Sequence, residues 1–114
     1  MNLQSLDRAE PFTTKDGSTI RELHHTSAQS LAEAALEPGQ ATQLHYHGRT
    51  EEIYLVTKGS GTVEVDGETR TVRPGDAILI PPGAWHTVEN DGTSELLILC
   101  TCVPPYAHED TFFE

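Results

Sequence analysis

Three histidines and an acidic pair in this sequence are residues of the types that can bind a metal ion, although such residues more often make ordinary hydrogen bonds or are solvated. His45 and His47 are one residue apart, Glu51 and Glu52 follow them, and His86 comes directly after a turn rich in proline and glycine. On a β-strand, residues i and i+2 point to the same side, so His45 and His47 project together. The surrounding residues are apolar enough to be core, where unpaired imidazole and carboxylate groups would be costly and metal coordination would satisfy them.

The same alternation predicts which way the neighbouring side chains point. Gln43 shares the face of the first two histidines and is predicted to look inward, near a metal. In the next segment Glu52 and Tyr54 share one face, while Glu51 lies on the other. Both faces are apolar further along, so alternation alone does not decide which glutamate points inward.

Short strands separated by glycine and proline are predicted for most of the chain, a pattern typical of a sandwich or barrel. Residues 62–65 and 69–72 alternate and flank Asp66-Gly67, a pair that tolerates the positive φ angles of a tight hairpin turn. Residues 30–36, SLAEAAL, stay ambiguous at this level because alanine, leucine and glutamate favour a helix.

The spaced residues resemble the two sequence motifs of the cupin superfamily, in particular those of small single-domain cupins with one conserved barrel. Every spaced position of both motifs is matched, over residues 39–90. The two blocks read Gly39-x5-His45-x-His47-x4-Glu52-x6-Gly59 and Gly75-x5-Pro81-x-Gly83-x2-His86-x3-Asn90.

This resemblance implies an all-β fold, a jelly-roll (double-stranded β-helix) barrel, with residues 1–114 as a single cupin domain. Residues 1–18 are then an N-terminal extension, residues 19–103 the approximate core barrel and residues 104–114 a C-terminal tail. The resemblance also implies that SLAEAAL is a strand, against its local propensity, since tertiary context can override propensity.

The resemblance further implies one divalent transition metal per chain, held by His45, His47, Glu52 and His86. Glu52 is preferred over Glu51 because it is correctly spaced from Gly59 in the first motif. Three imidazoles and one carboxylate suit Fe, Mn, Co, Ni, Cu or Zn ions and do not choose among them.

A metal-dependent enzyme acting on a small organic molecule is the first functional hypothesis, and a dioxygenase-type oxidoreductase is the preferred class. Its candidate catalytic residues are Tyr54, as a phenolic proton donor, and Gln43, as a hydrogen-bonding partner of a ligand or bound oxygen. Decarboxylation, isomerisation or lyase chemistry on the same metal is one alternative, because fold and ligand set do not determine the reaction. A non-catalytic binding or sensing barrel is another.

Four other residues near the motifs have simpler interpretations. Trp85 is assigned to surface or interface packing, and Arg49 to an exposed position. Cys100 and Cys102 are expected to fill buried space, as free cysteines commonly do, with a role as metal ligand or reductant as the alternative.

Composition excludes several partners. The formal net charge of −11, from 7 basic and 18 acidic side chains, argues against nucleic acid and against anionic membrane surfaces. No apolar run is long enough to span a bilayer, and the first residues do not have the features of a signal peptide. Two cysteines at alternate strand positions are poorly placed for a mutual disulfide, so we expect a reducing cytoplasm. The family resemblance implies a homodimer, with residues 19–25 as the candidate exchanged strand.

Overall fold

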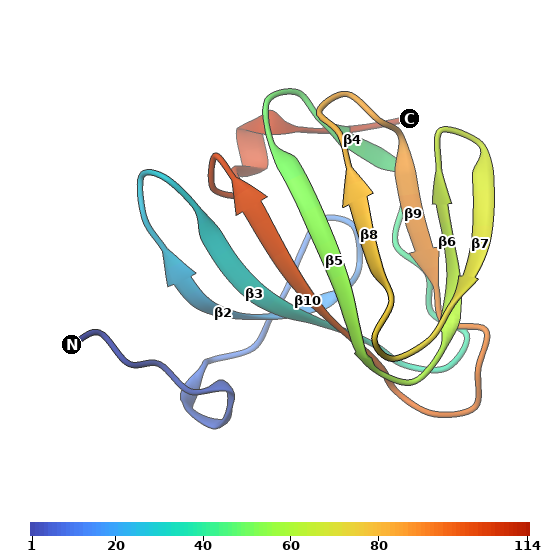
Figure 1. Cartoon of the computed structure of the whole chain (residues 1–114), viewed down its shortest axis with the longest axis horizontal. Coiled ribbons are helices and arrows are strands. Elements are labelled where there is room, and N and C mark those ends of the chain that lie inside the picture. The colour runs from blue at the N-terminus through green and yellow to red at the C-terminus, as the bar shows by residue number, and fades with distance from the viewer.

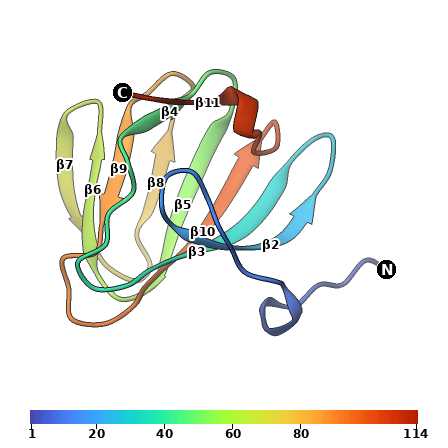
Figure 2. The ribbon, with the colours of Figure 1, turned by 180° about the vertical axis from the view of Figure 1, so that it is seen from behind.

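Two antiparallel β-sheets face each other and enclose the apolar core (Figures 1 and 2). The computed structural model describes residues 1–114 without a gap. The six-stranded sheet has the order β1-β2-β3-β10-β5-β8, and the five-stranded sheet has the order β11-β4-β9-β6-β7. This arrangement confirms the expected all-β jelly roll.

The strands and two short 3₁₀ helices follow one another along the chain as η1 Leu6–Arg8, β1 Phe12–Thr13, β2 Thr19–His25, β3 Ser30–Leu36, β4 His45–His47, β5 Glu51–Lys58, β6 Gly61–Val65, β7 Glu68–Val72, β8 Ala77–Ile80, β9 His86–Glu89, β10 Leu96–Val103, η2 His108–Asp110 and β11 Thr111–Phe113. Neither short helix has the length and apolar character needed to cross a membrane.

Strand β5 has the predicted alternation, and the structure shows which of its two faces points inward. Glu52, Tyr54 and Val56 are buried on its inner face, whereas Ile53 and Leu55 are exposed on its outer face. The strand pairs with β10 on one side and β8 on the other, which fixes the direction of its inner face. Packing between the sheets therefore selects the face that carries Glu52.

Tertiary pairing also decides the conformation of residues 30–36. This segment is strand β3, hydrogen-bonded to β2 along one edge and to β10 along the other, so its helical propensity is overridden. The predicted hairpin is present as well. Asp66 and Gly67 have φ angles of 48° and 85° and connect β6 to β7 in direct register.

One motif glycine is required by close packing. Gly59 lies between β5 and β6 with a φ of +78°, and a Cβ there would lie 2.4 Å from the carbonyl oxygen of Glu95. Any other residue would have to displace backbone, so this position permits glycine alone.

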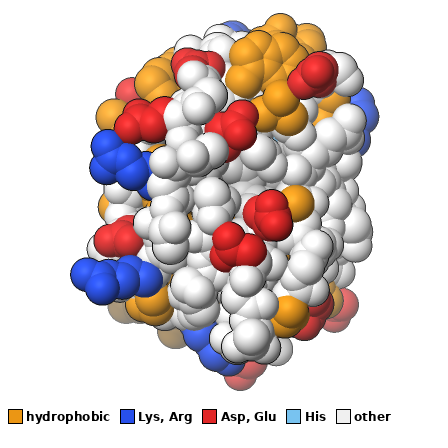
Figure 3. Space-filling view, turned by 90° about the vertical axis from the view of Figure 1, so that its right-hand side faces the viewer, with side chains coloured by type: hydrophobic (Ala, Val, Ile, Leu, Met, Phe, Trp, Pro, Cys, Tyr) orange, Lys and Arg blue, Asp and Glu red, His pale blue; other side chains and the backbone are white.

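The hydrophobic core occupies the space between the sheets. Its buried side chains come from both sheets and from the turn before β9, and they are Leu36, Tyr54, Val56, Val63, Val72, Ile80, Ala84, Val88, Leu96 and Ile98. On the face shown in Figure 3, acidic side chains are spread from end to end, and the most extensive hydrophobic surface lies at the upper end of the view.

Both ends of the chain take part in the sheets. Near the N-terminus β1 pairs with β2, and the loop that joins them is tied to the segment before β4, where the backbone N–H of Gln43 donates to the carbonyl of Asp16 at 2.9 Å. Near the C-terminus β11 pairs with β4 in register, so that Thr111 lies opposite His47. These two terminal segments therefore lie beside the histidine-bearing strand.

Candidate metal centre

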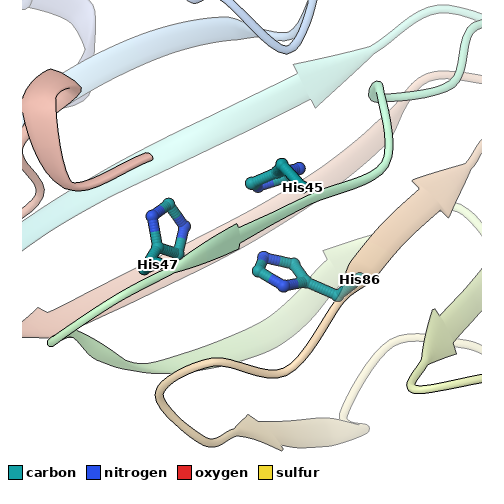
Figure 4. Close-up of side chains that lie close together, drawn as sticks. All are labelled: His45, His47 and His86. Carbon is teal, nitrogen blue, oxygen red and sulfur yellow. The ribbon is translucent and has the colours of Figure 1, made fainter. Parts of the chain in front are cut away.

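The three motif histidines meet between the sheets. His45 and His47 project from β4, and His86 projects from the neighbouring strand β9, where it is the register partner of His45. Each is at most 4 % exposed, and one ring nitrogen from each lies within 4.8 Å of the others. Figure 4 shows the three rings gathered around one space. Glu52 reaches this cluster from the opposite sheet.

The Nδ1 atoms of His45 and His86, on the side of each ring away from the centre, are hydrogen-bonded to backbone carbonyl oxygens. His45 Nδ1 lies 2.7 Å from the carbonyl oxygen of Gln43, and His86 Nδ1 lies 2.9 Å from that of Ala84. A carbonyl oxygen can only accept a hydrogen bond, so each Nδ1 carries a proton. The Nε2 atom of each neutral ring then carries a free lone pair.

A short relay gives His47 the same tautomer. The Thr111 hydroxyl donates to the carbonyl of Ala107 at 3.0 Å and lies 3.1 Å from His47 Nδ1. Since its proton is used on the carbonyl, the hydroxyl oxygen accepts from His47 Nδ1–H. All three Nε2 lone pairs are thus available to the centre, and such support of metal-binding histidines is usual.

Glu52 places a carboxylate against these nitrogens. Its Oε1 lies 3.4 Å from His47 Nε2 and 3.3 Å from His86 Nε2. Glu52 Oε1 and His86 Nε2 are buried without a hydrogen-bond partner. Two arrangements can satisfy them: protons on the imidazole nitrogens, or a cation among the four side chains.

The pKa values indicate an ionised Glu52 carboxylate and a His45 ring that resists protonation. Burial raises the pKa of Glu52, but the neighbouring His47 and His86 outweigh this and lower it to about 2. Burial, followed by the positive charge that His86 can carry, lowers the pKa of His45 below its ordinary 6.5. Three nitrogen donors and a carboxylate fit a divalent transition metal, so these four residues could hold one.

Tyr54 lies where the alternation predicted. It is buried on the inner face of β5, lines the same cavity, and its ring centroid is 6.0 Å from that of His86. Burial, with the nearby charge of Glu52, raises the pKa of Tyr54 well above 10.0, so its phenol stays protonated. The side chain can donate a hydrogen bond within the cavity.

The prediction that the Gln43 side chain points inward is wrong. Strand β4 begins only at His45, so the alternation does not extend back to Gln43, whose side chain is exposed. Thr42 is the buried residue of this segment and lines the cavity in its place. Gln43 contributes through its backbone carbonyl, which orients His45.

Arg49 and Trp85 lie outside the cavity. The Arg49 side chain is 74 % exposed and its Nε is 3.7 Å from the carboxylate of Asp110. Trp85 packs against Tyr46, with ring centroids 4.7 Å apart. Both positions agree with the interpretation of these residues as surface side chains.

The two cysteines lie on the cavity side of β10 as free thiols. Cys102 Sγ donates to Glu52 Oε2 at 3.4 Å, and Cys100 lies opposite Tyr54 in the sheet. Burial, with the negative charge of Glu52, raises the pKa of both thiols well above 9.0. They are neutral groups at physiological pH, and Cys102 orients the carboxylate.

Two functional positions escaped the sequence reasoning. Asp16, from the loop between β1 and β2, lines the cavity with its Oδ2 3.8 Å from His45 Nε2. Thr111 supports His47 from the C-terminal strand. Their only sequence signals were a turn pair, Asp16-Gly17, and an aromatic segment after the last long strand. Neither signal indicates a metal centre, because both residues reach it through contacts distant in sequence.

Comparison with known proteins identifies the family. A family model described as "Cupin domain" matches residues 32–102, more than half of the chain. The chain therefore belongs to the cupin family.

Three individual proteins illustrate this relationship. An uncharacterized protein of Methanocaldococcus jannaschii is 48 % identical over 110 residues, covering 92 % of this chain and 88 % of its own length. An "Oxalate-binding protein" of Thermotoga maritima is 30 % identical over 83 residues, covering 73 % of this chain and 69 % of its own. The solved structure of KdgF from a Halomonas species superposes with a TM-score of 0.84 at 21 % identity, covering 96 % of this chain and 97 % of that one. The last likeness concerns the fold alone.

Proposed function

We propose that this cupin binds one divalent transition metal through His45, His47, Glu52 and His86 and acts as a metal-dependent enzyme on a small organic molecule. A single observation carries the proposal. Three oriented Nε2 atoms and an unpartnered carboxylate oxygen converge, buried, beside a cavity. Such groups are costly to bury without a cation or protons to satisfy them.

A dioxygenase-type oxidoreductase is the reaction class that we place first. Histidine and carboxylate donor sets with open positions are typical of non-haem iron oxygenases. When bound, a divalent transition metal supplies Lewis acidity and, if it is redox-active, one-electron chemistry. The ligand set serves decarboxylases, isomerases and lyases equally well, so these remain the next classes to test.

The chain's own residues have distinct roles in this proposal. The carbonyls of Gln43 and Ala84 and the hydroxyl of Thr111 keep the ring nitrogens pointed at the centre. Tyr54 holds a proton at its phenolic oxygen and can donate a hydrogen bond through it to a substrate. The apolar side chains of the cavity, among them Ile98, exclude water around the reacting groups.

A non-catalytic binding protein is the second candidate. The observation that favours it is the similarity to the Thermotoga maritima relative whose name describes binding of oxalate and no reaction. Tight ligand binding without turnover would support this alternative.

Elemental mass spectrometry on tag-free protein from unsupplemented medium tests the metal. We expect about one Fe, Mn, Co, Ni, Cu or Zn per chain, because the donor set suits these ions. The metal-loaded protein is then screened for turnover and O2 uptake with diketones, thiols, hydroxy acids and catechols. A metal-free protein that cannot be reloaded contradicts the metal proposal, and a loaded protein without turnover favours the binding candidate.

We further propose that the chain forms a homodimer. The outer face of the six-stranded sheet exposes apolar side chains, including Leu79 at 56 % and Val103 at 54 %, beside Ile53 and Leu55. Exposed apolar sheet surface favours association. Light scattering checks this, and a monomer at micromolar concentration contradicts it.

A further inference from the structure

Asp16 is a second carboxylate at the centre, and the loop between β1 and β2 holds it rigidly. Its Oδ1 accepts hydrogen bonds from the backbone N–H of Ser18 at 3.0 Å, the Ser18 hydroxyl at 2.7 Å and the Thr14 hydroxyl at 2.5 Å. The side chain of Gln40 donates to the carbonyl of Gly17, which ties the loop to the segment before β4. In Figure 2 the chain before β2 loops across the open side between the sheets.

The other oxygen of Asp16 is free and points at the centre. Asp16 Oδ2 lies 3.8 Å from His45 Nε2, and the side chain is 19 % exposed. The Nδ1 proton of His45 is used on the carbonyl of Gln43, so Nε2 offers a lone pair and not a proton. Two acceptors therefore face each other, and the space beside them suits a cation or a hydrogen-bond donor.

The other charged side chains that line the cavity are also acidic. Its charged lining residues, apart from the histidines, are Asp16, Glu22 and Glu52, and neither lysine nor arginine lines it. A divalent metal beside Glu52 and Asp16 is already balanced by their two negative charges. An anionic substrate would find no further positive partner, and it would face Asp16 across a low-dielectric cavity.

We propose that Asp16 selects the substrate: a neutral or cationic small molecule that presents an N–H or O–H donor to Asp16 Oδ2, and not a dianion. The inference rests on the proposed metal-binding function and names the substrate class of that site. Asp16 is a substrate-contacting residue in this scheme, separate from the four metal-binding residues.

Two isosteric probes test the inference on the full-length, Co(II)-loaded protein. Oxalate carries two negative charges, whereas oxamate replaces one carboxylate by an amide and so carries one charge and an N–H donor. Affinities for both are measured by calorimetry, with metal content determined on the same samples. A divalent ion in water favours the dianion on electrostatic grounds. We expect the wild-type protein to bind oxamate at least as tightly as oxalate.

Substitution isolates the contribution of Asp16. Asp16→Asn removes the charge at nearly constant shape, and we expect it to shift the oxalate-to-oxamate affinity ratio toward oxalate about tenfold or more, as is typical for a close charge. Glu10→Gln removes the same charge from an exposed position of the same N-terminal segment and is expected to leave the ratio unchanged.

Each outcome has one meaning. A wild-type protein that prefers oxalate, or an unchanged ratio in a metal-loaded Asp16→Asn variant, overturns the role of Asp16. If Asp16→Asn does not fold, the wild-type preference still decides. Absence of bound Co(II) in the wild-type protein contradicts the proposed metal function instead, which keeps the two failures distinguishable.

Discussion

The two sheets contribute different chemistry to one site. The five-stranded sheet supplies three imidazoles, and a backbone carbonyl or Thr111 holds each ring from behind. The six-stranded sheet supplies Glu52, which has one long thiol hydrogen bond and one oxygen without a partner. The three imidazoles are thus held in position by hydrogen bonds from their own side of the molecule. The free oxygen of Glu52 gains a partner only when a cation or a proton lies between the two sheets.

This difference indicates which substitutions should weaken metal binding most. Loss of a ligand should abolish binding whichever sheet it comes from. Loss of an orienting group should matter more on the five-stranded side, where hydrogen bonds set the ring direction, than on the six-stranded side, where a weak thiol donor helps. Four experiments separate these contributions, from the largest expected effect to the smallest.

Removing a buried ligand should have the largest effect. His86 is fully buried and its Nε2 has no other partner, so His86→Ala should reduce bound metal to less than about a tenth of an equivalent per chain, because it removes one of the four donors and leaves a gap in the buried ligand cluster. Elemental mass spectrometry measures this. His108→Ala, at an exposed position in η2, is the matched control and should retain full occupancy. Retention of metal by His86→Ala would remove His86 from the centre.

Removing the support behind His47 should weaken the centre without abolishing it. Thr111→Val keeps the shape but deletes the acceptor of His47 Nδ1–H, and we expect metal affinity to fall about 10- to 100-fold. A chelator competition assay measures the dissociation constant. Thr93→Val, on an exposed loop, should change nothing. An unchanged constant for Thr111→Val would show that the relay does not orient the ring.

Acidification should destabilise the metal-free protein. Burial lowers the pKa of His45 below 6.5. Just below pH 6.5 the unfolded chain therefore binds a proton at His45 that the folded chain does not bind. Burial raises the pKa of Glu52, but its imidazole neighbours His47 and His86 outweigh this and lower it from 4.5 to about 2. Between these two pH values the unfolded chain therefore also binds a proton at Glu52 that the folded chain does not. The unfolded state holds more protons in both windows, so the free energy of unfolding falls as pH falls.

Thermal unfolding of the metal-free protein checks this sign. The expected melting temperature decreases from pH 7 downward, and in the Glu52→Gln variant the part of the decrease below pH 4.5 should be smaller. A melting temperature that rises on acidification would contradict both pKa directions.

Removing the thiol next to Glu52 should have the smallest effect. Cys102→Ala deletes the donor to Glu52 Oε2, and a single weak hydrogen bond predicts a loss of metal affinity of about twofold to tenfold. Cys100→Ala, on the same strand but bonded to a backbone carbonyl, is the control. If Cys102→Ala weakened binding more than Thr111→Val, the proposed contrast between the two sheets would be reversed.

Much of the fold and of the centre could be predicted from local patterns. The alternation of β5, the hairpin at Asp66-Gly67 and the motif spacing of the histidines all appear in the structure as expected. The alternation and the hairpin depend on the period of a strand and on turn chemistry, which act over a few residues. The meeting of His86 with the other two histidines was expected from the family resemblance.

Other features depended on contacts that no local pattern encodes. Strand β3 forms against its propensity because two neighbours pair with it, and Gln43 lies outside because β4 begins two residues after it. Asp16 and Thr111 reach the centre from the two terminal segments of the chain.

The sequence by itself determined the strand-rich character and the tight turns, because side-chain direction and turn geometry are short-range properties. The candidate ligands followed from the resemblance of the spaced residues to the cupin motifs. Only the tertiary structure decided that Glu52 faces the three histidines from the opposite sheet, that each imidazole is held in one tautomer, and that Asp16 makes the cavity acidic. Those properties arise where segments distant in sequence pack together, and packing across two sheets is set by the whole core.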